Sequence, residues 1–232
     1  MTRFDVVIPT FNAPAARLAA AVESTRACGG VSRVIVIDDG STPATLAPEG
    51  CELIRQSNAG PSAARNRGLE ASDAPWIVLL DDDDELLPRG VAAMIALAER
   101  LGAIAGVAAR FESRGELVRR KDVPVGWTGK LLPHWSDVLR PIAIFGASGL
   151  LVSRRAIESG IRFDVDLCIG EDREFLARIG QRGPIAVSGE PALTVALRDE
   201  GNLSSATHMA RRIRDHVVIA ARFGEPACAA HL

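Results

Sequence analysis

Short apolar runs alternate with longer helical patterns over the first hundred residues of the chain. The run from Trp76 to Leu80 is apolar at every position, as in a parallel strand that is covered on both faces. Strands that alternate with helices in this way are typical of βαβ units. We therefore predict an α/β fold with one mostly parallel, Rossmann-like sheet flanked by helices. The predicted strands are residues 6–8, 34–37, 52–55, 76–80 and 103–109, and the predicted helices are 14–27, 61–71 and 88–100.

The alternation weakens after Phe111, where glycine, proline and tryptophan are scattered through residues 123–133. A length of 232 residues is within the usual range of a single α/β domain. We therefore expect one domain over residues 1–232, with the irregular stretch as a smaller subregion. Further strands are predicted at residues 150–152 and 192–197, and further helices at 172–179 and 210–223.

Polar residues follow three of the predicted strands, at the point where each strand ends. The carboxyl ends of parallel strands face a common crevice, which is where open α/β sheets bind ligands. We therefore expect these polar groups to lie close together. They are Pro9-Thr10-Phe11-Asn12, Asp38-Asp39-Gly40-Ser41 and Asp81-Asp82-Asp83-Asp84-Glu85.

The five consecutive acidic residues from Asp81 to Glu85 leave a buried strand directly. Like charges at 4 Å repel by roughly 4 kcal/mol at an effective dielectric near 20, and a divalent cation would relieve that repulsion. Carboxylates suit Mg²⁺ and Mn²⁺, which are often bound by one or two of them together with substrate phosphates. The alternative is a solvated acidic turn. The position after a buried strand favours a metal site.

Three further groups admit both a structural and a functional interpretation. Asp39-Gly40-Ser41 is a common turn sequence, but Asp39 could also accept a hydrogen bond from a uracil N3–H or a ribose hydroxyl. The stretch from Asn58 to Asn66 is either a plain helix start or a loop whose amides and Arg65 bind an anion or a base edge. Asp172 either caps a helix or serves as a general base.

Composition excludes some classes of function. The 27 basic and 29 acidic residues leave no positive surplus for a nucleic-acid backbone, so we expect no nucleic-acid partner. No stretch approaches the ~18 apolar residues of a membrane span, and the first residues lack a signal-peptide layout, so we expect a cytoplasmic protein. The four cysteines lack zinc-site spacing and are expected to be reduced.

The motifs, taken in order, resemble those of glycosyltransferase family 2, whose members have the GT-A fold. The resemblance spans roughly residues 4–205. It is carried by Val7-Ile8-Pro9-Thr10-Phe11-Asn12, by Asp38 to Ser41, by Asn58 to Asn66, by Leu80 to Asp84 and by the pair Glu171-Asp172.

This resemblance implies inverting transfer of a hexosyl or N-acetylhexosaminyl group from a UDP-linked sugar to an acceptor hydroxyl, in polysaccharide or glycoconjugate biosynthesis. Residues 1–110 would form the nucleotide-sugar-binding half, and residues 111–232 the acceptor-binding half. Asp172 would be the general base, with Glu171 beside it, and Asp83 would bind Mn²⁺ or Mg²⁺. The donor-binding residues would be Pro9, Thr10, Asn12, Asp39, Gly60, Arg65, Asp81 and Asp82.

Two departures from the family pattern affect the metal assignment. Many relatives carry Arg-x-His near the end of the domain, whereas Arg198 is followed here by Asp199 and Glu200. His208 could take the place of that histidine as a metal ligand, although a lone histidine is more often a surface or packing residue. Asp82 occupies the middle of the acidic motif, which leaves open which carboxylates touch the metal.

Two rival functions remain. A nucleotidyltransferase should show a glycine-rich, basic phosphate loop after the first strand, but residues 9–16 contain no glycine and the first basic residue is Arg17. The other rival is a catalytically inactive module that binds a sugar nucleotide. Turnover of the donor by the purified protein would separate this module from an enzyme.

Overall fold

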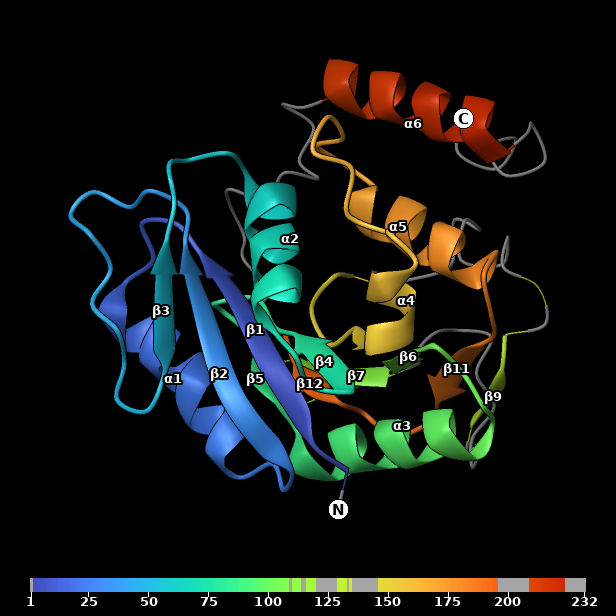
Figure 1. The fold of residues 1–232 in the computed structure, drawn as a ribbon, viewed down its shortest axis with the longest axis horizontal. Helices are drawn as coiled ribbons and strands as arrows, with labels where there is room; N and C mark the ends of the chain where they lie inside the picture. The colour runs from blue at the N-terminus through green and yellow to red at the C-terminus, as the bar shows by residue number, and fades with distance from the viewer. Residues whose placement is uncertain are drawn as a thin grey trace.

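The computed structural model describes residues 2–108, 110–113, 116–119, 129–132, 134, 146–195 and 209–223. Figure 1 shows a central sheet with helices on both faces. The elements are β1 (Phe4–Thr10), α1 (Ala15–Arg26), β2 (Val31–Asp38), β3 (Glu52–Arg55), α2 (Pro61–Ala71), β4 (Trp76–Leu79), β5 (Glu85–Leu86), α3 (Pro88–Arg100), β6 (Ala105–Ala108), β7 (Arg110–Ser113), β8 (Glu116–Arg119), β9 (Gly129–Leu131), β10 (Leu151–Ser153), α4 (Arg154–Glu158), α5 (Glu171–Gly180), β11 (Ile185–Ser188), β12 (Leu193–Thr194) and α6 (Met209–Phe223).

The main sheet has the strand order β3-β2-β1-β4-β10-β6-β11-β9. Strands β3, β2, β1 and β4 are parallel neighbours, and β6 pairs with β11 in parallel. The predicted α/β fold with a mostly parallel sheet is confirmed. The sheet is nevertheless mixed, because β10 lies antiparallel between β4 and β6, and β9 is antiparallel to β11.

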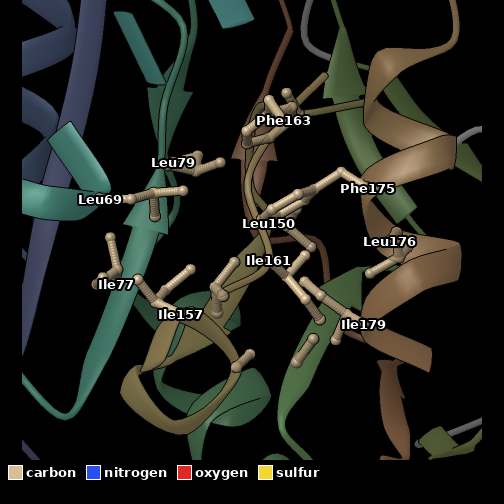
Figure 2. Packing of buried hydrophobic residues seen from close by; sticks show 14 of the residues in the cluster. Leu69, Ile77, Leu79, Leu150, Ile157, Ile161, Phe163, Phe175, Leu176 and Ile179 are labelled. Atoms are coloured by element: carbon tan, nitrogen blue, oxygen red, sulfur yellow. The ribbon is translucent and has the colours of Figure 1, made fainter. Parts of the chain in front are cut away.

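Two apolar clusters fill the two faces of the sheet. Val7 of β1 belongs to one cluster with Leu69 of α2, while its neighbours Val6 and Ile8 belong to the other with Leu18 of α1. Alternate side chains of a strand point to opposite faces, so β1 is buried on both. Figure 2 shows the first cluster, in which side chains of α2, β4, α4 and α5 meet.

Helix α2 lies unusually close to β1. A Cβ at Gly68 would come within 2.1 Å of Val7 Cγ1, so only glycine fits at this position. The N–H groups of Ala59 and Gly60, just before α2, donate to the Asp39 carboxylate, so the start of α2 lies beside the carboxyl end of β2, where the polar motifs gather.

Several short elements were not predicted. Strand β11 is buried at all four positions, yet a four-residue apolar run carries no period by which to identify it. Strands β5, β12, β7 and β8 form a second sheet, in which β12 lies within the strand predicted at residues 192–197, whereas β5, β7 and β8 were not predicted. The predicted helices at residues 61–71 and 88–100 are confirmed to the residue, and that at 210–223 to within one residue.

Some predictions lie outside the described residues, among them Trp127, Trp135, residues 196–197 of a predicted strand and His208. The division into a donor half and an acceptor half stays a prediction. Among the described residues, no helix has the length and apolar character needed to cross a membrane.

Candidate active site

The three polar clusters meet at the carboxyl ends of β2, β1 and β4, as predicted. The register pairs Thr10 with Asp38 across β1 and β2, and β4 lies on the other side of β1. The Asp39 N–H donates to the Thr10 carbonyl at 2.9 Å, and the Thr10 hydroxyl donates to Asp82 Oδ2 at 2.7 Å. Residues 10, 39 and 82 therefore form one connected site.

The Asp39 carboxylate is surrounded by hydrogen-bond donors from the loop before α2. Its Oδ1 accepts from Gln56 Nε2 at 2.7 Å and from the Ala59 N–H at 2.9 Å, and its Oδ2 accepts from the Gly60 N–H at 2.9 Å. Gly60 has a φ of +88°, which glycine adopts without a steric penalty. An ionised carboxylate offers about four acceptor positions, so about one remains for a further donor.

Asp38 and Asn12 build the frame around Asp39. The Asp38 carboxylate is fully buried and accepts from the Ser41 N–H and the Thr45 N–H, and it pairs with Arg55. Burial by itself would raise the pKa of Asp38, but these hydrogen bonds and the charge of Arg55 outweigh burial and lower that pKa. The Asn12 N–H donates to Ser41 Oγ at 2.9 Å, which joins the ends of β1 and β2.

Within the acidic run, Asp82 is held inside the protein. Besides the Thr10 hydroxyl, Asp82 pairs with Arg17 of α1 at 3.0 Å. Burial raises the pKa of the Asp82 carboxyl, while Thr10 and Arg17 act in the opposite direction. The partners of Asp82 thus come from β1 and α1, and Arg17 is a site residue that the sequence did not single out.

Asp81 contacts residues outside the acidic run, Ser148 and Arg65. Its N–H donates to Ser148 Oγ at 3.2 Å, and its Oδ1 accepts from Arg65 Nη2 at 2.9 Å. Asp83 is partly exposed at the turn that follows β4. The acidic run therefore presents Asp81 and Asp83 where a ligand can reach them.

The donor atoms of this turn fit a metal site that a substrate completes. Among the described residues, no group of three or more His, Cys, Asp or Glu side chains could by itself hold an ion. Mg²⁺ usually takes only one or two carboxylates and fills its coordination with water and substrate phosphates. Asp83 suits that arrangement as a ligand to Mn²⁺ or Mg²⁺. His208, the other predicted ligand, lies outside the described residues.

Arg65 of α2 connects the acidic run to helix α5. The arginine is only 6% exposed, and its Nη1 donates to Glu171 Oε1 at 3.2 Å while its Nη2 donates to Asp81. Its guanidinium also lies 5.6 Å from the ring centroid of Phe163, within the range of a cation–π contact. These contacts exclude the plain surface arginine that was the alternative, while the binding of an anion or a base edge by Arg65 stays a prediction.

Two adjacent carboxyl groups open helix α5. Gly170, with a φ of +79°, precedes Glu171, and Asp172 Oδ1 accepts the N–H of Arg173 at 2.7 Å. Burial, reinforced by the charge of Asp172, raises the pKa of Glu171 to about 7. Burial also raises the pKa of Asp172. A carboxylate that binds protons more tightly than usual is suited to proton transfer near neutral pH.

The structure brings together all the predicted site residues that it describes. It adds Arg17, Gln56 and Ser148, whose roles depend on contacts with residues far away in the sequence. The sequence singled out none of these three residues.

Comparisons with known proteins show which proteins the chain resembles. The model of Glycosyl transferase family 2 matches residues 5–165, which include every motif up to Asp84, while Glu171 and Asp172 lie beyond the match. Succinoglycan biosynthesis protein ExoO of Rhizobium meliloti is 32% identical over 91% of the chain and 64% of its own length. Protein ExoU of the same organism is 30% identical over 75% of the chain and 55% of its own length. The chain thus spans less than two thirds of these relatives.

Among solved structures, TarS of S. aureus has the same fold. Its complex with UDP superposes with a TM-score of 0.69 at 15% identity and covers 95% of this chain and 65% of TarS. Its complex with UDP-GlcNAc gives a TM-score of 0.68 at 17% identity over 94% of this chain and 67% of TarS.

Proposed function

This chain belongs to glycosyl transferase family 2, and we propose on that premise that it transfers a sugar from a UDP-sugar to an acceptor hydroxyl with inversion at the anomeric carbon. The observation that carries the proposal is the bridge from Asp81 through Arg65 to Glu171, because it joins the donor motifs to the carboxyl pair of α5. The complexes of TarS with UDP and UDP-GlcNAc support a UDP-linked donor, and ExoO supports a polysaccharide product.

In this proposal Asp39 recognises the nucleoside. Three hydrogen bonds hold its carboxylate in one orientation, and about one acceptor position remains for a uracil N3–H or a ribose hydroxyl. Pro9, Thr10 and Asn12 line the neighbouring end of β1, and Asp81 faces the sugar side of the donor. Because the Asp39 carboxylate is already ordered, binding does not have to order it.

Asp172 is the general base. It takes the proton of the acceptor hydroxyl as the hydroxyl oxygen attacks the anomeric carbon, and the bond from that carbon to the diphosphate oxygen breaks on the opposite face. UDP leaves with the bonding electrons, so no covalent intermediate with the protein forms. Mn²⁺ or Mg²⁺ at Asp83, when bound, would neutralise the negative charge that develops on the departing diphosphate.

A thermal-shift panel of UDP-glucose, UDP-galactose and UDP-N-acetylglucosamine, each with and without Mn²⁺, tests the donor class. A donor at a concentration ~100 times its dissociation constant stabilises the folded protein by about 2.7 kcal/mol. We expect one donor to raise the melting temperature, more strongly with Mn²⁺, and the purified protein to release UDP from it.

The variant Asp83→Asn tests the metal assignment, and it should reduce the effect of Mn²⁺ on donor binding. Unchanged Mn²⁺ dependence in Asp83→Asn would contradict the metal assignment. A thermal shift without UDP release would support the inactive binding module, and no shift with any of the three donors would overturn the UDP-sugar proposal.

A further inference from the structure

Helix α6 lies beyond the residues matched by the family model, and one of its faces covers the segment that leads into α5. Figure 1 shows α6 next to α5, on the side away from the central sheet. Asp215 and Ile219 are buried, whereas Ile213 and Val217 are more than half exposed. Ile219 joins the apolar cluster of α5, and its Cδ1 would lie 3.1 Å from a Cβ at Gly170. The inward face of α6 therefore packs beside the start of α5.

Asp215 holds the backbone just before the carboxyl pair. Its side chain is fully buried, and its Oδ2 accepts the N–H of Cys168 at 2.9 Å and that of Ile169 at 3.0 Å. Its Oδ1 accepts from Arg214 Nε at 2.7 Å, and Arg214 also donates to the Asp166 carbonyl at 2.8 Å. A buried carboxylate with two amide donors and an arginine has its charge compensated, so this contact can hold the loop firmly.

Arg222 contacts the chain both before and after the carboxyl pair. It contacts Asp164 in the loop and Glu174 in the first turn of α5. Glu174 is fully buried and also pairs with Arg178. Asp215 and Arg222 thus contact residues that flank Glu171 and Asp172 in the sequence on both sides.

Helix α2 holds the beginning of the same segment. Asn66 Oδ1 accepts the Phe163 N–H at 2.7 Å, and Asn66 Nδ2 donates to the Phe163 carbonyl at 2.9 Å. The Phe163 ring stacks on Phe175 of α5 with a centroid distance of 3.9 Å. Residues 163–174 are therefore fixed between α2 and α6.

We propose that Asp215 and Arg222 of α6 are positioning residues for the transfer reaction, because they keep the backbone around Glu171 and Asp172 in the geometry that proton transfer requires. This inference rests on the proposed role of Asp172. A general base must lie within hydrogen-bond reach of its proton, and a displacement of about 1 Å can cost ~10²-fold in rate. Asp39 is held by the loop before α2 and Asp82 by β1 and α1, so donor binding should not depend on α6.

Asp215→Ala is the variant that tests the proposal, and Asp5→Ala is its matched control. Asp5 is equally buried and is also paired with an arginine, Arg33 at 3.1 Å, but it lies near the amino end of β1. We expect Asp215→Ala to lower kcat for UDP release by about 10- to 100-fold, with the KM for the UDP-sugar changed less than about twofold. Asp215→Asn, which keeps one acceptor oxygen, should restore part of the rate.

Asp5→Ala should change kcat far less at a temperature at which both variants are folded. Equal kcat values for Asp215→Ala and Asp5→Ala would overturn the proposal. So would a loss caused entirely by a higher KM for the UDP-sugar.

Amide hydrogen exchange tests the contact itself and does not depend on turnover. The amides of Cys168 and Ile169 should exchange slowly in the unaltered protein and at least about 10-fold faster in Asp215→Asn, since they lose a charged acceptor. If the Asp215 variants do not fold, Arg222→Gln, whose side chain is already 39% exposed, replaces them in the rate measurement. Fast exchange at Cys168 and Ile169 in the unaltered protein would overturn the proposal.

The same measurements separate this inference from the proposed function. Full activity in Asp172→Asn would show that Asp172 is not the general base. The predicted effect of α6 on kcat would then fail as well, whatever the exchange rates of the Cys168 and Ile169 amides. Slow exchange together with normal kcat in Asp215→Ala, while Asp172→Asn is inactive, would overturn only the inference on α6.

Discussion

The carboxylate of Asp39 and the carboxyl pair Glu171-Asp172 belong to the same site but are held in opposite ways. Asp39 receives three hydrogen bonds, two of them from the main chain. Glu171 and Asp172 are neighbours, and burial raises the pKa of both. A carboxylate held by three hydrogen bonds keeps one orientation, which suits recognition, whereas a carboxyl pair with raised pKa values is suited to proton transfer.

Arg65 joins the two regions of this site. It pairs with Asp81 on the donor side and with Glu171 on the catalytic side. If the comparison is correct, changes at Asp39 should act on binding and changes at Asp172 on rate.

The largest effect on kcat is expected from a change at Asp172. Asp172→Asn removes the base without changing its size, so kcat for UDP release should fall by at least ~10²-fold while the donor KM stays close to normal. Steady-state kinetics measures both constants. A fully active Asp172→Asn enzyme would show that the proton goes elsewhere.

Asp39→Ala should act in the opposite way. It removes the acceptor for the nucleoside and leaves the Ala59 and Gly60 amides without their partner, and a hydrogen bond to a charged group contributes about 1.5–3 kcal/mol. We expect donor affinity to fall by about 10- to 100-fold, as measured by calorimetric titration, and kcat at saturating donor to change much less. Asp39→Asn, which keeps one acceptor oxygen, should lose less affinity. If kcat fell as much as affinity, the distinction between the two sites would not hold.

The pH dependence of kcat should report the ionisation of the neighbouring carboxyl groups Glu171 and Asp172. A general base works only when ionised, and burial raises the pKa of Asp172, so kcat should decrease with falling pH already above the range in which an ordinary aspartate is protonated. Glu171→Gln removes the neighbouring carboxyl group, and with it the repulsion between two negative charges, so it should move this acid limb to lower pH. A rate profile of Glu171→Gln that coincides with that of the unaltered protein would contradict this coupling.

The smallest effect is expected from Gly60→Ala. The φ of +88° at this residue is unfavourable for alanine by about 1–2 kcal/mol, although a Cβ there would meet nothing within 4 Å. We therefore expect Gly60→Ala to lower the melting temperature by a few degrees and to cause a modest loss of donor affinity. Gly50→Ala has a similar φ of +78° and equally open surroundings, so it should lose stability but keep donor affinity. Equal donor affinities in the two variants would show that the Gly60 amide does not shape the Asp39 site.

The elements that the sequence predicted well carry strong local signals. Helices α2 and α3 each begin with a proline in the first turn, and β4 is an apolar run before an acidic one. These signals act within a few residues, so they can be read without the fold. Strands β11 and β5 carry no such signal, because pairing with strands distant in the sequence creates them.

The residues of the site divide in the same way. By itself, the sequence determined which carboxylates and loops are candidates for the chemistry, since Asp39, Asp81 and Asp172 stand in short motifs of defined order. Only the tertiary structure decided their partners: Thr10 meets Asp82 across 72 positions, and Asp215 meets the Cys168 amide across 47. The sequence specifies which residues are carboxylates, but the hydrogen bonds and the pKa of each depend on the groups that folding places around it.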